Sequence, residues 1–421
     1  MITWSSLADP EIRVSFREAV RTSLAPGGAL WMPSDLTPWP DLEALLALPW
    51  RARNEGILTR LLGPDLPAGW AEALDLPFDL VRVAPETWAF ELWHGPTCAF
   101  KDVGARFLAA CLAPEEGPRM VLTATSGDTG AAVAAAVQAR PGLRAAVLYP
   151  AGRVSPLQEA QLALGGRVRA FAVAGDFDAC QTLVKGCFRE TALRTELGLV
   201  SANSLNPARW LPQALTYLEL VHRLRAAGEA RPPLIAVPSG NFGNLAAGLL
   251  AGRWGLPVAA FVAATNLNRT GPEALATGRY VPRPSRPTLS SAMDVGDPSN
   301  WPRVEALLGG ARDRLRAGWA DEAATAGALR SLWAAGYGAD PHGAVAWEVL
   351  GRLRRPGEPG VFLATAHPAK FQESLEPLLG RRIPAPPALA AALARRATGQ
   401  PLAADPEALR RVLRALAEEA V

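Results

Sequence analysis

The feature that most constrains the fold is a regular alternation of short apolar runs with Ala- and Leu-rich stretches, which begins near residue 86. This alternation is typical of βαβ units, which build a parallel sheet covered by helices. At 421 residues the chain exceeds the usual size of one domain, so two or three packed units with a cleft between them are expected. The sequence therefore predicts an α/β architecture with strands at 120–124, 144–148, 168–173, 234–237, 258–263 and 361–364.

The segments outside this alternation differ in composition. Residues 1–85 are rich in Pro and Trp with two or three helical patterns, and we expect a separate N-terminal unit there. Residues 278–303 hold five prolines, too many for a helix or a central strand, so a long surface or active-site loop is predicted. Residues 381–421 are rich in Ala, Leu and Arg and predict a C-terminal helical segment that packs on the core.

Charge and spacing argue against several classes of function. The net charge of +3 comes from interspersed signs without a basic block, so nucleic-acid binding is not expected. No run of 18 apolar residues occurs and the first residues do not read as a signal peptide, which predicts a cytoplasmic protein that does not span a membrane. The four cysteines lack C-x-x-C spacing, and the four histidines show no zinc-ligand pattern, so reduced thiols and no metal centre are expected.

Lysine is rare in this chain. Of 43 basic residues only Lys101, Lys185 and Lys370 are lysines, and the other 40 are arginines. A coding bias toward arginine explains the composition, but arginine cannot supply a neutral amine, whereas a desolvated lysine can act as a nucleophile or form a Schiff base. Each lysine is therefore a candidate for chemistry. Lys101 lies where apolar residues begin to recur at three- and four-residue steps, so we expect it near a helix N-terminus.

Three glycine-containing loops follow a predicted strand or precede a helix. They span residues 94–97, 125–130 and 239–244. Glycines let backbone N–H groups approach a phosphate or carboxylate, and the following helix adds the positive end of its dipole. Any one of these loops is equally well explained as an ordinary strand-to-helix turn. Two such loops together with a rare lysine favour an anion site, and neither loop has the pattern of an ATP- or NAD-binding loop.

The sequence around the first lysine reads ELWHGPTCAFKD over residues 91–102, and more blocks of this kind follow it. The chain resembles threonine synthase, a family in the tryptophan-synthase-β fold group of pyridoxal-phosphate enzymes, over about residues 86–380. The blocks that carry the resemblance are TATSGDTGAA at 123–132, YPAGRVSPLQEAQ at 149–161, GDFDACQTLVK at 175–185, SANSLNPARW at 201–210, VPSGNFGN at 237–244, AATNLN at 263–268, SSAMDVGDPSNWPRV at 290–304, GADPHGAVA at 338–346 and TAHPAKF at 365–371.

The resemblance implies pyridoxal-phosphate fold type II, with two open, twisted, mostly parallel sheet domains and flanking helices beside the N-terminal unit. The first domain is expected at 86–215, with the cofactor lysine and a substrate-carboxylate loop. The second is expected at 216–380, with the loop for the cofactor phosphate. By the same resemblance, Lys101 would anchor pyridoxal 5'-phosphate as a Schiff base. The other cofactor-binding residues would be Gly240, Asn241, Phe242 and Asn244 at the phosphate, and Thr365 at the pyridine nitrogen.

The resemblance also implies a substrate and a reaction. Carried over position by position, the substrate-binding residues are Ser126, Gly127, Asp128, Thr129, Arg153, Asn203 and Arg209, of which Asn203 and Arg209 would bind the substrate's phosphate. The implied enzyme is a carbon–oxygen lyase that acts on phosphate. It converts O-phospho-L-homoserine and water to L-threonine and phosphate, the last step of threonine biosynthesis, and is expected as a monomer or homodimer.

Alternatives remain at this point. A related lyase or dehydratase would give 2-oxobutanoate from the same class of substrate, and a homologue that binds the cofactor without catalysis would act as a regulatory partner. Within the resemblance, Cys98 departs from an aliphatic position and is expected to be a small buried hydrophobe. Asp128 is unusual in an anion-binding loop and is expected to point away from the anion. Lys185 is expected on the surface, and Lys370 receives no role.

Overall fold

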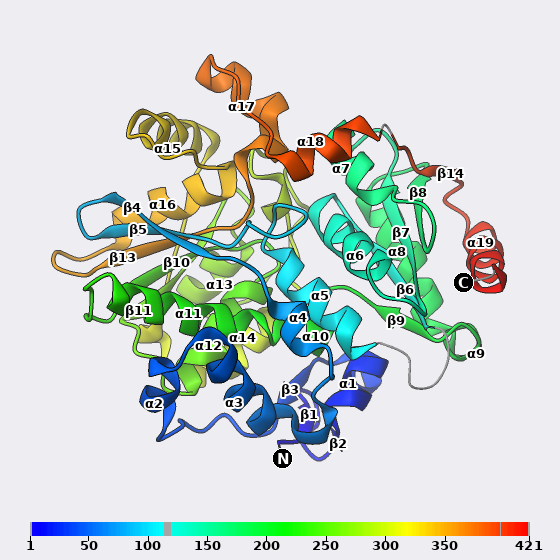
Figure 1. Cartoon of the computed structure of the whole chain (residues 1–421), viewed down its shortest axis with the longest axis horizontal. Helices are drawn as coiled ribbons and strands as arrows, with labels where there is room; N and C mark the ends of the chain where they lie inside the picture. Colours follow the sequence, from blue (N-terminus) through cyan, green and yellow to red (C-terminus); the bar gives the residue numbers. More distant parts are fainter. Residues whose placement is uncertain (1, 113–118, 396, 420–421) are drawn as a thin grey trace.

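The computed structural model describes residues 2–112, 119–395 and 397–419, so the outermost residues of two predicted units, Met1 and 420–421, lie outside the described part. Two large sheets dominate this part (Figure 1). One has six strands in the order β12 (Leu315–Trp319), β11 (Ala260–Thr265), β10 (Leu234–Pro238), β13 (Gly360–Ala364), β5 (Thr87–Glu91) and β4 (Asp79–Ala84). The other has five, in the order β14 (Gln400–Leu402), β8 (Val168–Val173), β7 (Leu143–Pro150), β6 (Arg119–Ala124) and β9 (Leu199–Ser201).

Both sheets are built mainly from parallel pairs. All five strands of the smaller sheet run parallel, and in the larger sheet only β4 pairs antiparallel, with β5. Strands such as β7 and β10 are buried along their whole length, as expected for parallel strands with helices on both faces. The predicted α/β architecture is confirmed. The six predicted strands correspond to β6, β7, β8, β10, β11 and β13, with ends that differ by two residues or fewer.

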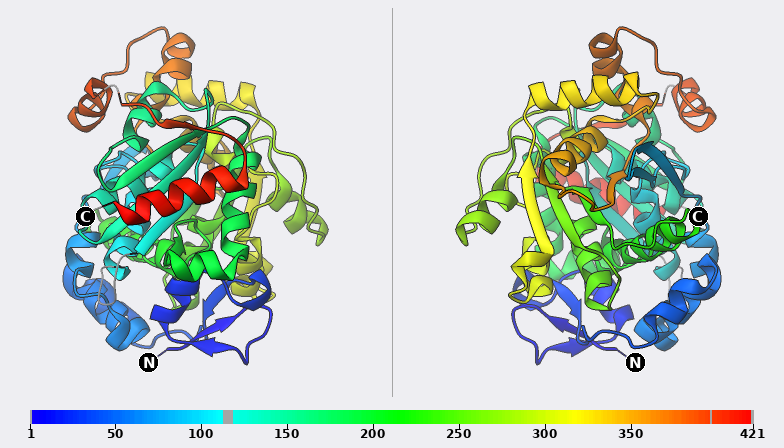
Figure 2. Two further views of the ribbon diagram at one scale, coloured as in Figure 1. Left: turned by 90° about the vertical axis from the view of Figure 1, so that its right-hand side faces the viewer. Right: turned by 90° about the vertical axis from the view of Figure 1, so that its left-hand side faces the viewer.

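Helices connect the strands and cover the sheets (Figure 2). Their N-termini carry typical caps: the side chain of Asp176 accepts from Ala179 N–H at α8, and Ser155 forms a capping box with Gln158 at α7. The helices are α1 (Phe16–Thr22), α2 (Leu42–Ala47), α3 (Trp50–Leu62), α4 (Trp70–Leu74), α5 (Lys101–Cys111), α6 (Asp128–Gln138), α7 (Pro156–Leu162), α8 (Phe177–Arg189), α9 (Thr191–Glu196), α10 (Pro207–Trp210), α11 (Gln213–Ala226), α12 (Gly243–Arg253), α13 (Thr270–Thr277), α14 (Trp301–Leu308), α15 (Glu322–Ala334), α16 (Pro341–Leu353), α17 (Gln372–Leu379), α18 (Pro387–Ala394) and α19 (Pro406–Glu418). Short 3-10 helices are η1 (Pro26–Gly28), η2 (Gly63–Asp65), η3 (Ser291–Met293), η4 (Arg312–Arg314) and η5 (Pro368–Phe371).

The N-terminal residues form more than the predicted helices. A small antiparallel sheet, β2 (Arg13–Val14), β1 (Trp4–Ser6) and β3 (Trp31–Pro33), precedes α2 to α4. This part lies below the two large sheets in Figure 1. The three strands were not predicted because each has only two or three residues, too few to show an alternating pattern.

Strand pairing crosses two of the boundaries expected from the sequence. Strands β4 and β5 lie at 79–91, yet β5 pairs with β13, so both belong to the sheet of the second expected domain. Strand β14 lies in the C-terminal segment, where only helix was expected, and pairs with β8. Helix α19 then packs Leu409, Leu413 and Leu416 into the same core as β6 to β8. The expected division into domains stays a prediction, with these crossings as its exceptions.

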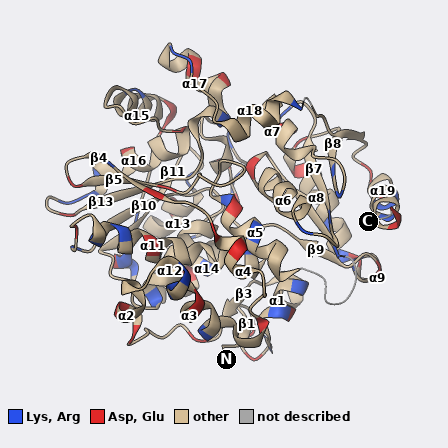
Figure 3. Ribbon diagram, viewed as in Figure 1, with Lys and Arg blue, Asp and Glu red and all other residues tan. Residues whose placement is uncertain are grey.

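The proline-rich segment forms a long loop, as predicted. After Gly278 ends α13, the chain has no regular element until η3, and α14 begins at Trp301. Basic and acidic residues are interspersed over the elements (Figure 3). No helix in the described residues is long and apolar enough to cross a membrane.

Candidate active site

A cleft of about 810 Å³ lies between loops of the two large sheets. Its walls come from the loops that follow β6 and β9 in one sheet and β10 and β13 in the other, with α8 and the proline-rich loop at its sides. In α/β folds, ligands bind beyond the carboxyl ends of parallel strands, because the loops and helix N-termini converge there. All the residues predicted for the site line this cleft except Gly127.

Lys101 is the first residue of α5 and faces the cleft, with 18% of its side chain exposed. The loop before it is fixed to the segment after β13, because Phe100 N–H donates to Thr365 O at 2.8 Å and Ala99 bridges to Ala366. These two contacts fix the positions of Lys101 and Thr365 relative to each other. Burial lowers the pKa of the Lys101 amine, the charge of Asp128 opposes this, and the charges of Lys370 and Arg209 reinforce it.

The loop after β6 is organised by Thr125. Its hydroxyl accepts from the N–H groups of Gly127 at 3.0 Å and Gly130 at 2.9 Å. Gly127 has φ 142°, and a Cβ there would lie 2.4 Å from the amide of Gln158, so only glycine fits. Gly127 therefore shapes the loop from behind while Ser126, Asp128 and Thr129 line the cleft.

Asp128 lies between two lysines. Its Oδ1 is 2.9 Å from Lys370 Nζ and its Oδ2 is 3.6 Å from Lys101 Nζ, with 4% of the side chain exposed. Burial alone would raise the pKa of Asp128, but the charges of Lys370 and Lys101 outweigh burial and hold it below its ordinary value. Asp128 is thus a buried carboxylate at the base of the cleft.

The loop after β10 forms a cradle for an anion. Phe242 has φ 59°, a left-handed conformation uncommon outside glycine, and it directly precedes α12. The N–H groups of Gly240, Asn241 and Phe242 find no acceptor among the described residues. A Cβ on Gly240 would lie 2.7 Å from Met293 Cα in η3, so the close approach requires glycine. Unpaired N–H groups at a helix N-terminus suit a phosphate.

Three further predicted residues line the side of the cleft near β9 and β7. Arg209 on α10 is buried and donates to Ala202 O, and its Nε has no partner among the described residues. Burial lowers the pKa of Arg209 to about 10, which leaves it charged at neutral pH. Asn203 accepts from the Thr123 hydroxyl at 3.0 Å, and Arg153 is exposed at the rim.

A buried pair in the segment GADPHGAVA was not singled out from the sequence. His342 lines the cleft, its Nδ1 lies 2.5 Å from Asp340 Oδ2, and its Nε2 accepts from Ala292 N–H at 3.2 Å. The pair thereby holds η3 against the cradle. In the sequence this pair is marked only by Asp340-Pro341, a typical helix start, and Asp340 does cap α16. The cap could be predicted, but the contact with Ala292 could not.

Two further expectations concern the Cys98 thiol and the Lys185 amine. Cys98 is buried, and burial raises its pKa to about 11, in agreement with a small buried hydrophobe. Lys185 is exposed on α8, as predicted, and lies at the mouth of the cleft.

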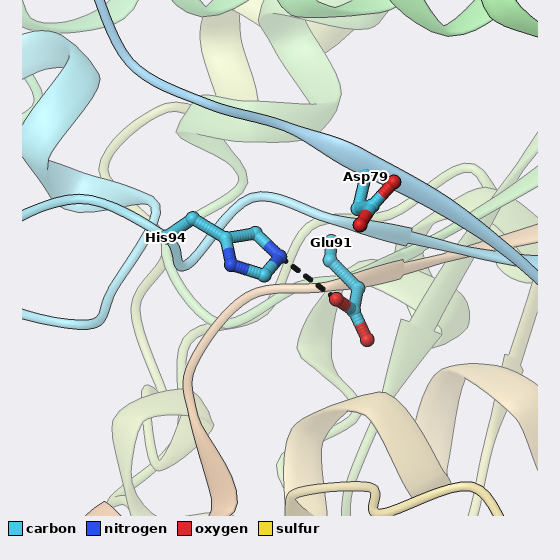
Figure 4. Close-up of side chains that lie close together, drawn as sticks. All are labelled: Asp79, Glu91 and His94. Carbon is cyan, nitrogen blue, oxygen red and sulfur yellow. Dashed lines mark hydrogen bonds and ion pairs between the residues drawn. The ribbon is translucent and has the colours of Figure 1, made fainter. Parts of the chain in front are cut away.

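One group of side chains of the kind that binds metals comes together outside the cleft. Ligand atoms of Asp79, Glu91 and His94 lie within 4.8 Å of one another at the β4–β5 edge (Figure 4). Glu91 Oε2 is 2.8 Å from His94 Nε2, and His94 stacks on Trp93 with ring centroids 4.0 Å apart. Because Glu91 and His94 already pair with each other, the group needs no ion to satisfy these two residues.

Comparison with known proteins agrees with this geometry. A model of the pyridoxal-phosphate dependent enzyme family matches residues 82–366, and a model of the threonine synthase C-terminal region matches residues 343–413. A threonine synthase of Haemophilus influenzae is 44% identical over 396 residues, which cover 91% of this chain and 93% of that protein. One of Escherichia coli is 43% identical over 422 residues, which cover 97% and 98%.

Solved structures agree as well. The structure of threonine synthase from Escherichia coli has a TM-score of 0.92 at 42% identity and covers 98% of this chain and 99% of its own. The structure of threonine synthase from Brucella melitensis with bound pyridoxal phosphate has a TM-score of 0.91 at 29% identity and covers both chains fully. The predicted pyridoxal-phosphate fold type II is thereby confirmed. The chain belongs to the threonine synthase family of pyridoxal-phosphate dependent enzymes.

Proposed function

We propose that this chain converts O-phospho-L-homoserine and water to L-threonine and phosphate. The observation that carries the proposal is the Lys101 amine, which faces a cleft between the phosphate cradle at 240–244 and the loop at 126–129, with buried Arg209 beside it. A substrate with a carboxylate, an amine and a phosphate needs this combination of anion sites around one amine.

The cradle and the lysine fit pyridoxal phosphate. The free N–H groups of Gly240, Asn241 and Phe242, with Asn244 next to them, would hold its phosphate, and Thr365 would meet its ring nitrogen with a neutral hydroxyl. When bound through Lys101, the cofactor supplies an electron sink that stabilises negative charge on the substrate carbon next to the amine.

The chain's own residues then bind the substrate and move its protons. The loop of Ser126, Gly127, Asp128 and Thr129 would orient the carboxylate end. Asn203 and Arg209 would hold the phosphate, with Arg153 at the rim, because a planar guanidinium pairs well with phosphate oxygens.

Lys101 is the proposed proton carrier. When the amine of the substrate takes its place at the cofactor, the Lys101 amine would be free. The burial that lowers its pKa favours the neutral form, which can remove a proton from Cα and, after passing this proton on, one from Cβ. The bond between Cγ and the phosphate oxygen breaks, and phosphate leaves with the bonding electrons. Water then adds its hydroxyl at Cβ, and its other proton goes to the released phosphate. Protons return to Cγ, which becomes the methyl group of threonine, and to Cα.

The test is a visible spectrum of the purified protein before and after addition of O-phosphohomoserine, with phosphate and threonine measured in the same tube. We expect a band that shifts with substrate and equal amounts of phosphate and threonine. Lys101→Ala and Lys101→Arg should both abolish threonine formation, since arginine keeps the charge but cannot form a Schiff base. Phosphate with 2-oxobutanoate instead of threonine would move the assignment to a lyase of the alternative kind.

The assembly and location of the enzyme belong to the same proposal. A monomer or homodimer in the cytoplasm is what the sequence predicts. The four cysteines are free in the described residues, in line with the expected reduced thiols.

A further inference from the structure

Lys370 is a buried lysine to which the proposed reaction assigns no role. It lies on η5, with 0% of its side chain exposed. Its Nζ donates to Thr97 O at 2.8 Å and Gln161 Oε1 at 2.9 Å, and lies 2.9 Å from Asp128 Oδ1. Two of the three donors of the ammonium group therefore make hydrogen bonds, and Asp128 Oδ1 faces the group as an ion pair. A charged amine can stay buried when it is paired and hydrogen-bonded in this way.

Lys101 has a different environment although it shares the same carboxylate. Its Nζ lies 3.6 Å from Asp128 Oδ2, whereas Lys370 Nζ lies 2.9 Å from Asp128 Oδ1. The attraction between charges falls with distance and is strengthened by hydrogen bonds. Asp128 is therefore engaged mainly by Lys370.

The charged groups that face Lys101 come from three elements. Asp128 from α6 favours a charged amine, while Lys370 from η5 and Arg209 from α10 oppose it. Asp102, on α5 itself, is occupied by Thr97, which donates to it through its N–H at 2.9 Å and its hydroxyl at 2.7 Å. Asp128 thus lies closer to Lys370 than to Lys101, and the charges of Lys370 and Arg209 disfavour a proton on the Lys101 amine.

We propose that Lys370 is a positioning residue that acts through Asp128: it fixes this carboxylate and takes up its charge, so that Lys101 is the lysine that can lose its proton. The inference rests on the proposed role of Lys101 as cofactor anchor and proton carrier. It assigns the two buried lysines different tasks: Lys370 pairs with Asp128, and Lys101 carries the proton.

Two substitutions should move the Lys101 amine in opposite directions. Lys370→Met removes a neighbouring cation and frees Asp128 to pair with Lys101, and both effects favour the charged amine. Asp128→Asn removes the carboxylate whose charge favours the protonated Lys101 amine, so it should favour the neutral amine. A merely structural role for Lys370 would lower stability without producing shifts of opposite sign.

The experiment is competitive labelling of lysines with acetic anhydride across a pH series. The full chain is used after hydroxylamine has released its cofactor as an oxime and dialysis has removed it. Labelled peptides are quantified by mass spectrometry. The chain is suited to this because it has only three lysines, and exposed Lys185 serves as the internal reference. Circular dichroism checks that each protein is folded.

In the unsubstituted protein we expect Lys101 to be labelled with a lower midpoint pH than Lys185, and Lys370 to stay unlabelled. In Lys370→Met the Lys101 midpoint should rise by about one pH unit, which makes its labelling about tenfold slower at neutral pH. In Asp128→Asn it should fall.

Two outcomes would overturn the proposal. The first is a Lys101 midpoint at or above that of Lys185 in the unsubstituted protein, a result that does not depend on how any variant folds. The second is an unchanged midpoint in folded Lys370→Met protein. Labelling is read without substrate, so a failure here is distinct from a failure of the proposed reaction, which is judged by its products.

Discussion

At the scale of single residues, Asp294 organises the proline-rich loop beside the cleft. Its Oδ1 accepts from the Thr288 hydroxyl at 2.7 Å and from the side chains of Asn266 at 2.9 Å and Asn268 at 3.1 Å, while Oδ2 accepts from Thr288 N–H at 3.0 Å. The residue directly before it, Met293, lies against Gly240 of the phosphate cradle. One carboxyl group therefore connects the loop to the cradle.

Asp294 should make stability depend on pH. Burial raises its pKa to about 6, against the hydrogen bonds from Thr288 and Asn266 that lower it. The folded pKa lies above the ordinary value, so folding favours the protonated form. Its contribution to stability is fully present below about pH 4 and is lost as the pH rises from there to about 6.

This prediction is checked by urea unfolding of the parent protein and Asp294→Asn between pH 4 and 7.5. Their difference in unfolding free energy should change between about pH 4 and 6 and level off above pH 6, with the parent losing stability relative to the variant as pH rises. Comparison with the variant cancels the other groups that titrate in this range. A difference that stays constant over the whole range would contradict the raised pKa.

Some residues of the site can be recognised from their neighbours in the sequence, and others only from contacts made in the fold. Lys101 could be singled out because lysine is rare here and apolar residues after it indicated a helix start, where the structure places it. The cradle at 240–244 could be found because its glycines follow an apolar run. The role of Lys370 could not be found, because Thr97, Gln161 and Asp128 come from three separate segments that meet only in the fold.

At the scale of elements, the close crossing of α5 and α10 positions the lysine. A Cβ on Gly104 of α5 would lie 2.2 Å from the carbonyl oxygen of Arg209 on α10. Both helices carry residues of the site, since Lys101 starts α5 and Arg209 lies in α10. The distance between the Lys101 and Arg209 side chains thus depends on Gly104, which has no side chain.

We predict that Gly104→Ala destabilises the protein by about 1–3 kcal/mol and lowers activity, because the methyl group must push the two helices apart. The matched control is Gly186→Ala on α8, where a Cβ meets nothing within 4 Å. Alanine is the better helix former, so this variant should gain about 0.5–1 kcal/mol. Both are measured by chemical denaturation and a threonine assay, and equal effects of the two changes would refute the steric argument.

The elements that could be predicted are those with continuous apolar runs. Strands β6, β7, β8, β10, β11 and β13 are central and buried, and their sequences show this directly. Strand β4 has no buried residue and β12 only one, so they lack such a run and were not predicted. Strand β14 has only three residues, and its pairing with β8 is a long-range contact without a local signal.

At the scale of the whole molecule, the N-terminal part is joined to the larger sheet domain by buried polar and aromatic contacts. Arg53 on α3 is fully buried and pairs with Glu219 on α11. Trp39 stacks on Trp254 with ring centroids 4.6 Å apart. The N-terminal residues are therefore an integral part of the fold.

The Arg53–Glu219 pair should be costly to break from one side. Glu219→Leu leaves the Arg53 charge buried without its carboxylate, and we expect a loss of about 3–5 kcal/mol. The double variant Arg53→Met, Glu219→Leu removes both charges and should recover a large part of this loss. Urea unfolding of the parent, both single variants and the double variant measures the coupling, and additive effects would show that the two side chains act independently.

The pairing of β5 with β13 and of β8 with β14 also has a consequence for synthesis. A ribosome delivers the chain from the N-terminus at about 5–20 residues per second. Strand β5 is therefore made long before its partner β13, and β8 long before its partner β14, which lies near the end of the chain. Until then each nascent sheet presents a free edge, a surface on which unrelated strands can dock and aggregate. Neither sheet can be completed before almost the whole polypeptide has emerged, so the cleft is assembled after translation rather than during it.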